Sequence, residues 1–232
     1  MERKHIEPET SNVVGIQFGV MSPEEIRERS VVEVTTHETY EKDVPVVKGL
    51  FDIRMGTTDM GKVCGTCGQC DVDCPGHFGH IELARPVYHY QFLTMIQKIL
   101  RCTCIQCSKL LVNKESPQVK SLMKKSNKAR WNEIYKMSQK ITRCGQENDD
   151  GCGAKQPDKL KVDGMEGIYA VWSKLDSEDQ SSKTQKLIIE QVKSILERIS
   201  DEDVNVLGFS DMWCRPEWFV CSVFPIAPPA VR

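Results

Sequence analysis

The cysteines of this chain are the residues whose type and spacing could do chemistry. Nine of the eleven lie between positions 64 and 152, in two clusters. The first cluster contains Cys64, Cys67, Cys70, Cys74, His77 and His80, and the second contains Cys102, Cys104, Cys107, Cys144 and Cys152. Structural zinc takes four thiolate or imidazole ligands in a tetrahedron, and a Cys-x-x-Cys pair supplies two of them from one turn. Two such pairs, each followed by a closing pair, predict two zinc sites.

The first cluster offers six candidates for four ligand positions. Spacing allows a Cys₃His set made of Cys64, Cys67, Cys74 and His77. It also allows a set that starts at Cys67 and uses Cys70, and His80 could replace His77 in either set. The second cluster is simpler, because its spacing predicts one Cys₄ set that closes a long loop. That set is Cys104, Cys107, Cys144 and Cys152.

Four good ligands at each site leave no coordination position for water, so we expect structural zinc and not catalytic zinc. A single Cys-x-x-Cys pair could serve thiol redox chemistry, but two pairs with closing ligands favour metal. Cys214 and Cys221 have no paired spacing, and we expect them to be small buried apolar residues.

Composition excludes several other classes of protein. The chain has 232 residues, 40% of them hydrophobic, and a formal net charge of −2, which fits one large domain or two small ones. No apolar run approaches the ~18 residues of a membrane span, so we expect no membrane segment. The charged start, residues 1–5, argues against a secretory signal. Common nucleotide-binding and hydrolase motifs are absent, and we expect no catalytic residue in this chain.

The elements that must position the cysteines are mixed, which predicts an α+β fold with short strands and several helices. Alternation of apolar residues predicts a strand over residues 12–20 and a second over residues 31–35. Between them, Ser22-Pro-Glu-Glu25 is a capping box with proline at the first helical position, and it predicts a short helix ending near Ser30.

The pattern continues with further helices towards the end of the chain. One is expected over residues 88–100 and another over about 178–199, each with one apolar face. Ser200 is expected to cap a short helix that stops near Gly208. The pattern of residues 218–224 predicts a strand, which leads into an extended, proline-rich segment (the proline-rich exit) over residues 225–232.

Charge is concentrated in one segment. Residues 108–143 contain ten Lys or Arg and two acidic residues, so this segment carries +8 while the rest of the chain carries about −10. One interpretation is the solvated face of a helical insertion. The other is a surface that contacts the phosphates of nucleic acid without reading sequence. The candidate contact residues are Lys120, Lys124, Lys125, Lys128 and Arg130.

Several motifs together resemble one family. They are Asp52-Ile-Arg-Met-Gly-Thr57, Cys74-Pro-Gly-His-Phe-Gly-His80-Ile-Glu-Leu-Ala-Arg-Pro-Val87, Cys104-Ile-Gln-Cys107-Ser-Lys-Leu-Leu111, Arg215-Pro-Glu-Trp-Phe219 and Pro225-Ile-Ala-Pro-Pro-Ala-Val-Arg232. In this order they look like the beginning of the largest subunit of multisubunit DNA-directed RNA polymerases, most similar to the eukaryotic RNA polymerase II type. The resemblance is weakest over residues 110–142 and 157–200.

The resemblance implies an irregular, zinc-stabilised clamp that closes over the DNA cleft and the RNA–DNA hybrid. Residues 1–100 would form a clamp core with the first zinc site, and residues 101–160 a clamp head with the second site and the basic insertion. Residues 161–232 would form a helical part that returns to the core and ends in the proline-rich exit. The ligand sets implied are Cys64, Cys67, Cys74 and His77 for one Zn²⁺, and Cys104, Cys107, Cys144 and Cys152 for the other. Roles for Cys70, His80 and Cys102 are left open.

The resemblance also implies partners: the second-largest and smaller polymerase subunits, template DNA, nascent RNA, and transcription factors that bind the clamp. The family holds its catalytic Mg²⁺ in an Asn-Ala-Asp-Phe-Asp-Gly-Asp loop, which does not occur in these residues. Mg²⁺ is therefore expected only in the complete polymerase, a nucleotidyltransferase, and not in this chain alone. The expected location is the nucleus for a cellular protein, or a viral factory or virion for a protein of a large DNA virus. The alternative hypothesis is a free-standing zinc-ribbon adaptor that binds nucleic acid.

Overall fold

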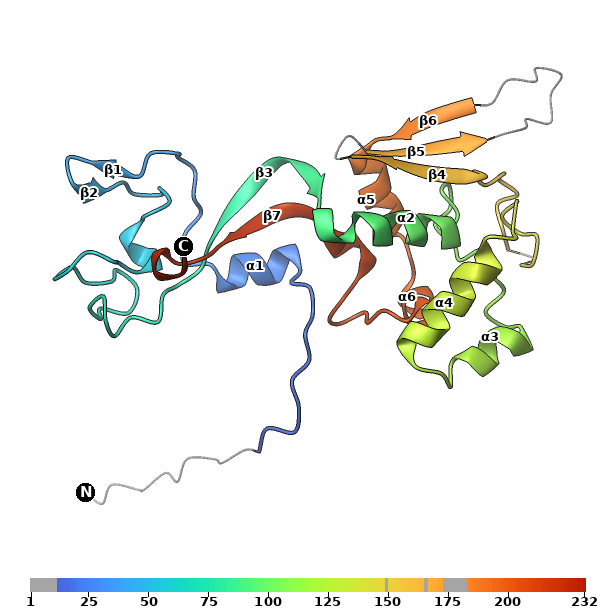
Figure 1. Ribbon diagram of the computed structural model, residues 1–232, viewed down its shortest axis with the longest axis horizontal. Helices are drawn as coiled ribbons and strands as arrows, with labels where there is room; N and C mark the ends of the chain where they lie inside the picture. Colours follow the sequence, from blue (N-terminus) through green and yellow to red (C-terminus); the bar gives the residue numbers. More distant parts are fainter. Residues whose placement is uncertain (1–11, 149, 165–166, 173–182) are drawn as a thin grey trace.

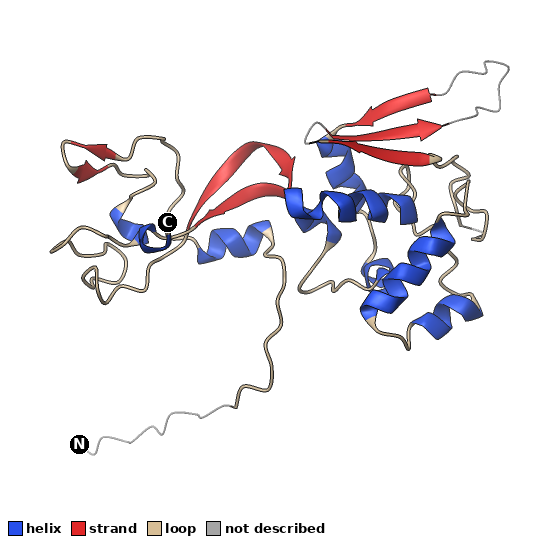
Figure 2. Ribbon diagram, in the orientation of Figure 1, coloured by secondary structure: helices blue, strands red, loops and turns tan. Residues whose placement is uncertain are grey.

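The computed structural model describes residues 12–148, 150–164, 167–172 and 183–232. Figure 1 shows two lobes of unequal size joined by a two-stranded ribbon, with the end of the chain at Arg232 returning to the smaller lobe. Short strands and short helices alternate with long loops, as the colouring in Figure 2 makes plain. This arrangement confirms the α+β fold class expected from the sequence.

The elements have the following bounds. The helices are α1 Pro23–Arg29, α2 Leu93–Cys102, α3 Pro117–Leu122, α4 Asn127–Ser138, α5 Ile189–Glu197 and α6 Asp201–Leu207. Single 3₁₀ turns are η1 Ile53–Met55, η2 Tyr90–Phe92, η3 Pro216–Phe219 and η4 Pro229–Val231. The strands are β1 Tyr40–Glu41, β2 Val44–Pro45, β3 Gly79–Tyr88, β4 Lys159–Asp163, β5 Gly167–Trp172, β6 Lys183–Leu187 and β7 Val220–Ile226. In the described part of the chain, no helix has the length and apolar character needed to cross a membrane.

The smaller lobe has very little apolar core. Its buried hydrophobic cluster consists of Val32, Val34, Met55 and Ile226. The remainder of the lobe is loop, apart from η1, η4 and the β1–β2 hairpin. Because so little apolar surface is buried, the lobe needs another source of stability.

The ribbon between the lobes is formed by β3 and β7, which pair in antiparallel fashion from Gly79–Ile226 to Tyr88–Val220. The register shifts between Glu82 and Val87, so the pairing is interrupted at mid-ribbon. An interruption of this kind bends a strand and increases its twist, which fits the arch of β3 in Figure 1.

Helix α1 lies along this ribbon, and its start agrees with the sequence. Ser22 and Glu25 form the expected reciprocal capping box. The strand expected over residues 12–20 was wrong, because the backbone of residues 12–22 belongs to no helix or strand. Val14, Ile16 and Phe18 are 100%, 81% and 92% exposed. Alternation gives a strand only where a neighbouring strand pairs with the backbone, and the described residues offer none here.

The larger lobe is built around a three-stranded antiparallel sheet in the order β4-β5-β6. One face of this sheet is buried, through Leu160, Ile168, Ala170, Trp172 and Leu187. Figure 1 shows helices α2 and α5 on that side of the sheet. From Ile168 to Trp172, β5 alternates buried and half-buried residues, as expected of a central strand in a sheet that is covered on one face.

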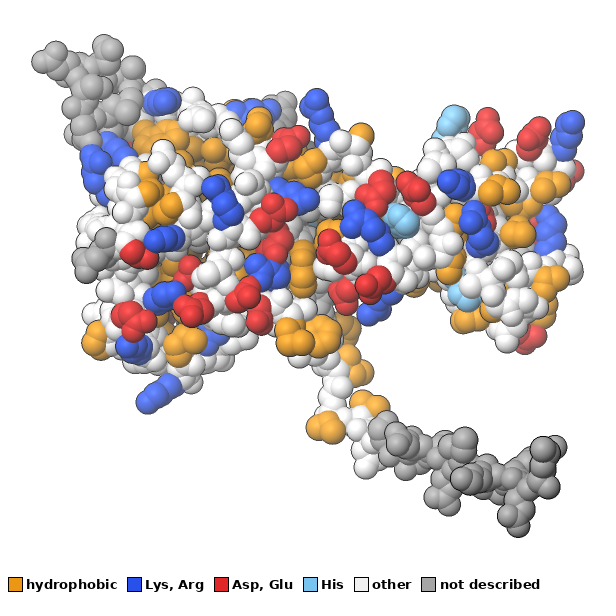
Figure 3. Space-filling view, turned by 180° about the vertical axis from the view of Figure 1, so that it is seen from behind, with side chains coloured by type: hydrophobic (Ala, Val, Ile, Leu, Met, Phe, Trp, Pro, Cys, Tyr) orange, Lys and Arg blue, Asp and Glu red, His pale blue; other side chains and the backbone are white. Residues whose placement is uncertain are grey.

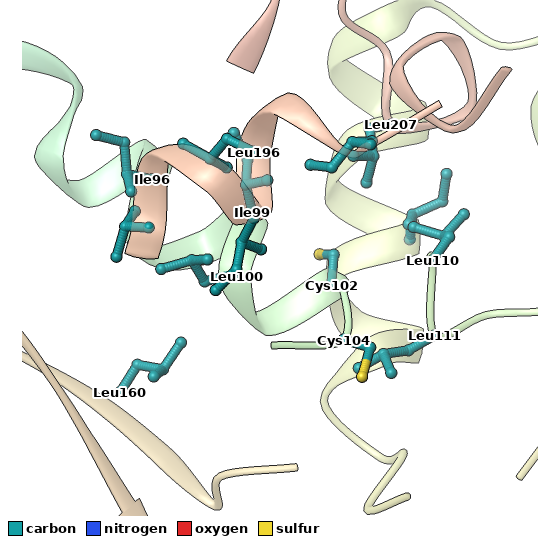
Figure 4. Packing of buried hydrophobic residues seen from close by; sticks show 14 of the residues in the cluster. Ile96, Ile99, Leu100, Cys102, Cys104, Leu110, Leu111, Leu160, Leu196 and Leu207 are labelled. Atoms are coloured by element: carbon teal, nitrogen blue, oxygen red, sulfur yellow. The ribbon is translucent and has the colours of Figure 1, made fainter. Parts of the chain in front are cut away.

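The core of the larger lobe joins the sheet to the helices and to the second cysteine cluster. Figure 4 shows Ile96, Ile99 and Leu100 of α2 packed beside Leu196 of α5. Cys102 and Cys104 belong to the same buried cluster. Both cysteines are fully buried. The second candidate site is therefore anchored directly in the main core.

Four elements differ from the sequence expectation. The strand expected over residues 218–224 is β7 at Val220–Ile226, because residues 216–219 form η3. The helix expected over residues 88–100 begins later, at Leu93, because Tyr88 still belongs to β3. The helix expected over about 178–199 begins at Ile189, since residues 183–187 form β6, and residues 178–182 lie outside the described part. The strand expected over residues 31–35 is present only as a single parallel bridge between Glu33 and His80. The short helix capped by Ser200 and ended by Gly208 is confirmed.

Candidate metal centres

The first group of ligand atoms lies in the smaller lobe, between η1 and β3. The ligand atoms of Cys64, Cys67, Cys74 and His77 lie within 4.8 Å of one another. The Sγ atoms of Cys67 and Cys74 are 3.6 Å apart. The structure thus brings together one of the sets that spacing allowed.

A tight turn presents the first pair of these ligands. The amide of Cys64 donates to the carbonyl of Gln69 at 2.9 Å, and the amide of Gly68 donates back to the carbonyl of Cys64 at 2.9 Å. Within the turn, the amide of Thr66 points at Sγ of Cys64, 3.4 Å away. Gly68 has a φ of +69°, in the left-handed region that glycine adopts without steric cost.

The closing pair of the first group is held against the chain's C-terminal segment. The amide of His77 donates to the carbonyl of Met55 at 3.0 Å, which fixes the loop on η1. A Cβ atom added to Gly76 would lie 2.6 Å from Cβ of Pro228, so only glycine allows this approach. The Nε2 atom of His77 is buried and has no hydrogen-bond partner within the described residues.

The second group lies in the larger lobe and joins parts of the chain that are far apart in sequence. The ligand atoms of Cys104, Cys107, Cys144 and Cys152 lie within 4.8 Å of one another. Sγ of Cys104 is 3.6 Å from Sγ of Cys152, and Sγ of Cys107 is 3.6 Å from Sγ of Cys144. The structure therefore assembles the full Cys₄ set expected from the sequence.

The first turn of the second group repeats the hydrogen bonds of the first group. The amide of Cys104 donates to the carbonyl of Lys109, and the amide of Ser108 donates to the carbonyl of Cys104, both at 2.9 Å. The amide of Gln106 lies 3.5 Å from Sγ of Cys104. Ser108 has a φ of +63° at the position that Gly68 occupies in the first turn. Two unrelated sequences thus build the same ligand-bearing turn.

A glutamine that the sequence reasoning missed supports the second group. The side chain of Gln156 is 2% exposed, and its Nε2 lies 3.2 Å from Sγ of Cys104. Its Oε1 accepts a hydrogen bond from the amide of Ile105 at 3.3 Å. Donors to a ligand atom orient it and partly neutralise its charge. Because Gln156 lies 52 residues after Cys104, no local spacing pointed to it.

The geometry of both groups fits zinc. With a Zn–S bond of about 2.3 Å, the sulfur atoms of a tetrahedral site lie about 3.8 Å apart. Three sulfur pairs, each at 3.6 Å, approach this value. They are far from the ~2.05 Å of a disulfide. The donor chemistry, seven thiols and one imidazole with no carboxylate, is that of closed structural zinc sites.

The electrostatics of the two groups call for a cation. Burial, together with the neighbouring thiols, raises the pKa of Cys74 to about 11. Burial likewise raises the pKa of Cys104 and of Cys144 above the ordinary thiol value. At Cys64 and Cys152 burial acts in the same direction, but hydrogen bonds from backbone amides and neighbouring thiols outweigh it and lower the pKa, so each group favours one thiolate among protonated thiols. Several thiolates cannot be held this close together near neutral pH without a compensating positive charge. A divalent metal would supply that charge and displace the protons.

The remaining members of the two clusters lie outside these groups. Cys70 is exposed, and its Sγ contacts Oδ2 of Asp73 at 3.1 Å. His80 contacts Oγ of Ser30 through Nδ1 at 2.7 Å, at the end of α1. Cys102 is fully buried in the core, and burial raises its pKa to about 12. Each of the three therefore has a local structural role that does not involve the metal groups.

The basic segment folds into α3, α4 and their connection. Lys120, Lys124, Lys125 and Lys128 are exposed there, which fits both the solvated helical face and the phosphate-contacting surface. Lys120 also forms an ion pair with Glu115 at 2.7 Å.

Arg130 differs from the four lysines of the basic segment, because it is only 8% exposed. Its guanidinium donates to the side chain of Asn127 at 3.0 Å. It points into the α3–α4 turn, where it cannot reach a phosphate in this conformation, because residue 130 lies on the inner face of α4.

Comparison with known proteins identifies relatives of the chain. The family model described as RNA polymerase Rpb1, domain 1, matches residues 10–232. The chain is also similar to the DNA-directed RNA polymerase II subunit RPB1 of Euplotoides octocarinatus, with 39% identity over 226 residues. That alignment covers 94% of this chain and 47% of the relative. The chain thus spans about half the length of the curated relative it matches.

Proposed function

Because the chain belongs to the RNA polymerase family described as RNA polymerase Rpb1, domain 1, we propose that it forms the clamp of a DNA-directed RNA polymerase largest subunit. In this role it would close over the DNA cleft and the RNA–DNA hybrid during transcription. The observation that carries the proposal is the family match over residues 10–232 in a chain that assembles both ligand groups.

Two structural Zn²⁺ ions are part of this proposal. Cys64, Cys67, Cys74 and His77 would hold one ion, and Cys104, Cys107, Cys144 and Cys152 the other. When bound, each ion supplies a cross-link and no reactive group, because all four positions are filled by protein. The chain's own residues position the ligands: the two turns orient the thiols, and Gln156 holds Cys104 in place.

The division into clamp core and clamp head is also proposed. The smaller lobe, with the first ligand group, would be the core, and the larger lobe would be the head. We place the boundary at the β3–β7 ribbon instead of at residue 100. This placement rests on α2, which packs within the core of the larger lobe.

The proposed contact with nucleic acid is electrostatic. Lys124 and Lys125 are exposed on the α3–α4 connection and Lys128 on the first turn of α4, and the three form no ion pair within the described residues. They could approach a duplex backbone, where each phosphate contact releases counterions and gives a salt-dependent affinity. Lys120 would join them once its pairing with Glu115 is exchanged for a phosphate.

The proposed partners are the second-largest and smaller polymerase subunits, template DNA, nascent RNA and clamp-binding transcription factors. The catalytic Mg²⁺ would be held elsewhere in the complete polymerase, and this chain would contribute position and rigidity. Since the matched relative is an RNA polymerase II subunit, we place the protein in the nucleus.

Duplex DNA binding at two salt concentrations tests the proposal. A clamp that works within a polymerase should bind duplex weakly as an isolated chain at about 150 mM salt, which is close to physiological ionic strength. Assembled polymerase should hold DNA tightly, and Lys124→Ala/Lys125→Ala should weaken that binding most at low salt, where counterion release contributes most. Tight binding by the isolated chain with a steep salt dependence would instead support a free-standing zinc-ribbon adaptor.

A further inference from the structure

The outer face of the β4-β5-β6 sheet carries a row of lysines around one aromatic ring. In the strand register, Lys161 of β4 lies opposite Tyr169 of β5, and Tyr169 lies opposite Lys186 of β6. Residues directly opposite each other project from the same face of a sheet. The lysines are exposed and the tyrosine is half-buried, so the row lies on the face turned away from the core.

Lys159 adds a third positive charge to this face, next to Val171 and Thr184 in the adjoining row. None of the three lysines forms an ion pair within the described part of the chain. Asp163, at the end of β4, is the one acidic residue of the described strands with the same orientation. Two lysines beside the second ligand group differ, since Lys109 and Lys114 are paired with acidic residues.

The tyrosine of this row already binds a cation. Nζ of Lys186 lies 5.7 Å from the centroid of the Tyr169 ring. Adjacent strands lie about 4.8 Å apart, so Lys161 and Lys186 flank the ring with their backbones about 10 Å from each other. An aromatic ring between two unpaired ammonium groups can stack on a base while the ammonium groups bind the phosphates on either side.

A hollow extends this row beyond the edge of the sheet. A cavity of about 410 Å³ runs along β4, and its lining includes Lys159, Lys161, Arg101 and Tyr135 together with one acidic residue, Asp158. Here too a lysine lies over the ring, since Nζ of Lys98 is 5.8 Å from the centroid of Tyr135. The same combination of aromatic ring and cation therefore occurs twice along one continuous surface.

Figure 3, which views the molecule from behind, shows Lys and Arg side chains along the edge of the larger lobe where the sheet lies. This edge is separate from the α3–α4 connection, which Figure 1 places at the opposite end of the same lobe. The larger lobe thus has two basic surfaces, and only the one on the sheet contains aromatic rings between the charges of its described residues.

We propose that the outer face of the β4-β5-β6 sheet, with its adjoining cavity, binds single-stranded nucleic acid. Tyr169 stacks on a base, and Lys159, Lys161 and Lys186 contact the flanking phosphates. A duplex is a poor ligand for this surface, because its base faces are already stacked on one another and cannot stack on Tyr169. The proposal rests on the proposed function for the class of ligand, nucleic acid, and adds a second site with a different preference.

Fluorescence anisotropy of the zinc-loaded 232-residue chain tests this proposal, with a labelled single-stranded oligonucleotide and the matching duplex at several salt concentrations. Lys161→Ala/Lys186→Ala should weaken binding of the single strand. It should also reduce the slope of log affinity against log salt by about 1.4, or about 0.7 for each phosphate that is no longer neutralised. Tyr169→Leu should weaken binding at least about fivefold with the slope unchanged, because stacking releases no counterions.

Lys124→Ala/Lys125→Ala is the matched control, since it removes the same charge from exposed positions on the other surface. It should affect the duplex and leave the single strand nearly unchanged. The proposal is overturned if the parent chain does not bind the single strand at the lowest salt, or if the sheet variants bind it like the parent. It is also overturned if poly-glutamate displaces the oligonucleotide as well as unlabelled oligonucleotide does.

The outcomes separate this proposal from the proposed function. Sheet variants with normal single-strand binding, beside a control variant with impaired duplex binding, would overturn the sheet site alone. The reverse pattern would overturn the DNA contact of Lys124 and Lys125 and leave the sheet site standing.

Discussion

The cross-link at Cys144 offers the sharpest test of the zinc proposal. Cys144 is 3% exposed, and its Sγ lies 3.6 Å from Sγ of Cys107, which is 37 residues away in sequence. In the chain-entropy treatment of a cross-link, closing a loop of this length is worth about 4 kcal/mol at 25 °C. We expect Cys144→Ser to lower the free energy of unfolding by about that amount, because three ligands hold zinc far less tightly than four.

Zinc counting and denaturation together provide the assay. Native mass spectrometry should find two zinc ions in the parent chain and one in Cys144→Ser. Guanidinium denaturation can be followed by tryptophan fluorescence, to which one of the four tryptophans, Trp172, contributes a probe that is buried and hydrogen-bonded to the backbone of Lys155 near the second site. The large apolar core of this lobe should keep it folded, but with a lower midpoint.

Cys221→Ser is the control, since Cys221 is half-buried on β7 and belongs to neither ligand group. It should keep both zinc ions and change stability much less. A chelator should remove the difference between the parent and Cys144→Ser, because both then lack the cross-link. The reasoning is refuted if Cys144→Ser keeps two zinc ions and the midpoint of the parent.

Three further perturbations probe the smaller lobe and the start of the chain. Gly76→Ala should lower the denaturation midpoint more than Gly68→Ala. Both glycines have positive φ, but only at Gly76 would an added Cβ meet a neighbour, Cβ of Pro228 at 2.6 Å. Equal reductions in the two variants would contradict this reasoning. Asp52 is 2% exposed, and its arginine partner lowers its pKa from 3.8 to about 2. Its contribution, about 2 kcal/mol at most because that partner is half-exposed, is present above pH ~4 and lost towards pH ~2. The gap in stability between parent and Asp52→Asn should therefore close over this range, and a constant gap would refute it. Phe18→Ser should leave the free energy of unfolding of the isolated chain within ~0.5 kcal/mol, as measured by denaturation, since Phe18 is 92% exposed.

The two ligand groups were largely predictable because their first pairs are local. Cys64–Cys67 and Cys104–Cys107 each lie within one turn, where spacing alone fixes the approach of two sulfurs. The closing ligands of the first group were not fixed by spacing. Only the turn at Gly76 and the contact with Pro228 place His77, and not His80, beside the thiols.

The features that could not be predicted depend on contacts distant in sequence. Gln156 reaches Cys104 across 52 residues, so no local pattern indicates it. Arg130 looked like a surface residue because composition does not say which face of α4 turns inward. Residues 12–20 have the alternation of a strand, but a strand also needs a partner, which the sequence pattern does not provide.

The unequal cores of the two lobes explain why a metal would matter differently in each. In the larger lobe, Cys104 and Cys144 are part of a broad apolar cluster that would hold much of the fold without zinc. In the smaller lobe, four buried residues form the core, and the ligand loop packs on the C-terminal segment through Gly76 and Pro228. A metal there stabilises both the loop and the return of the chain along β7. β7 is also one of the two strands of the ribbon between the lobes. The first zinc site would therefore affect how rigidly the ribbon holds the larger lobe, although the site lies at the opposite end of the molecule from that lobe.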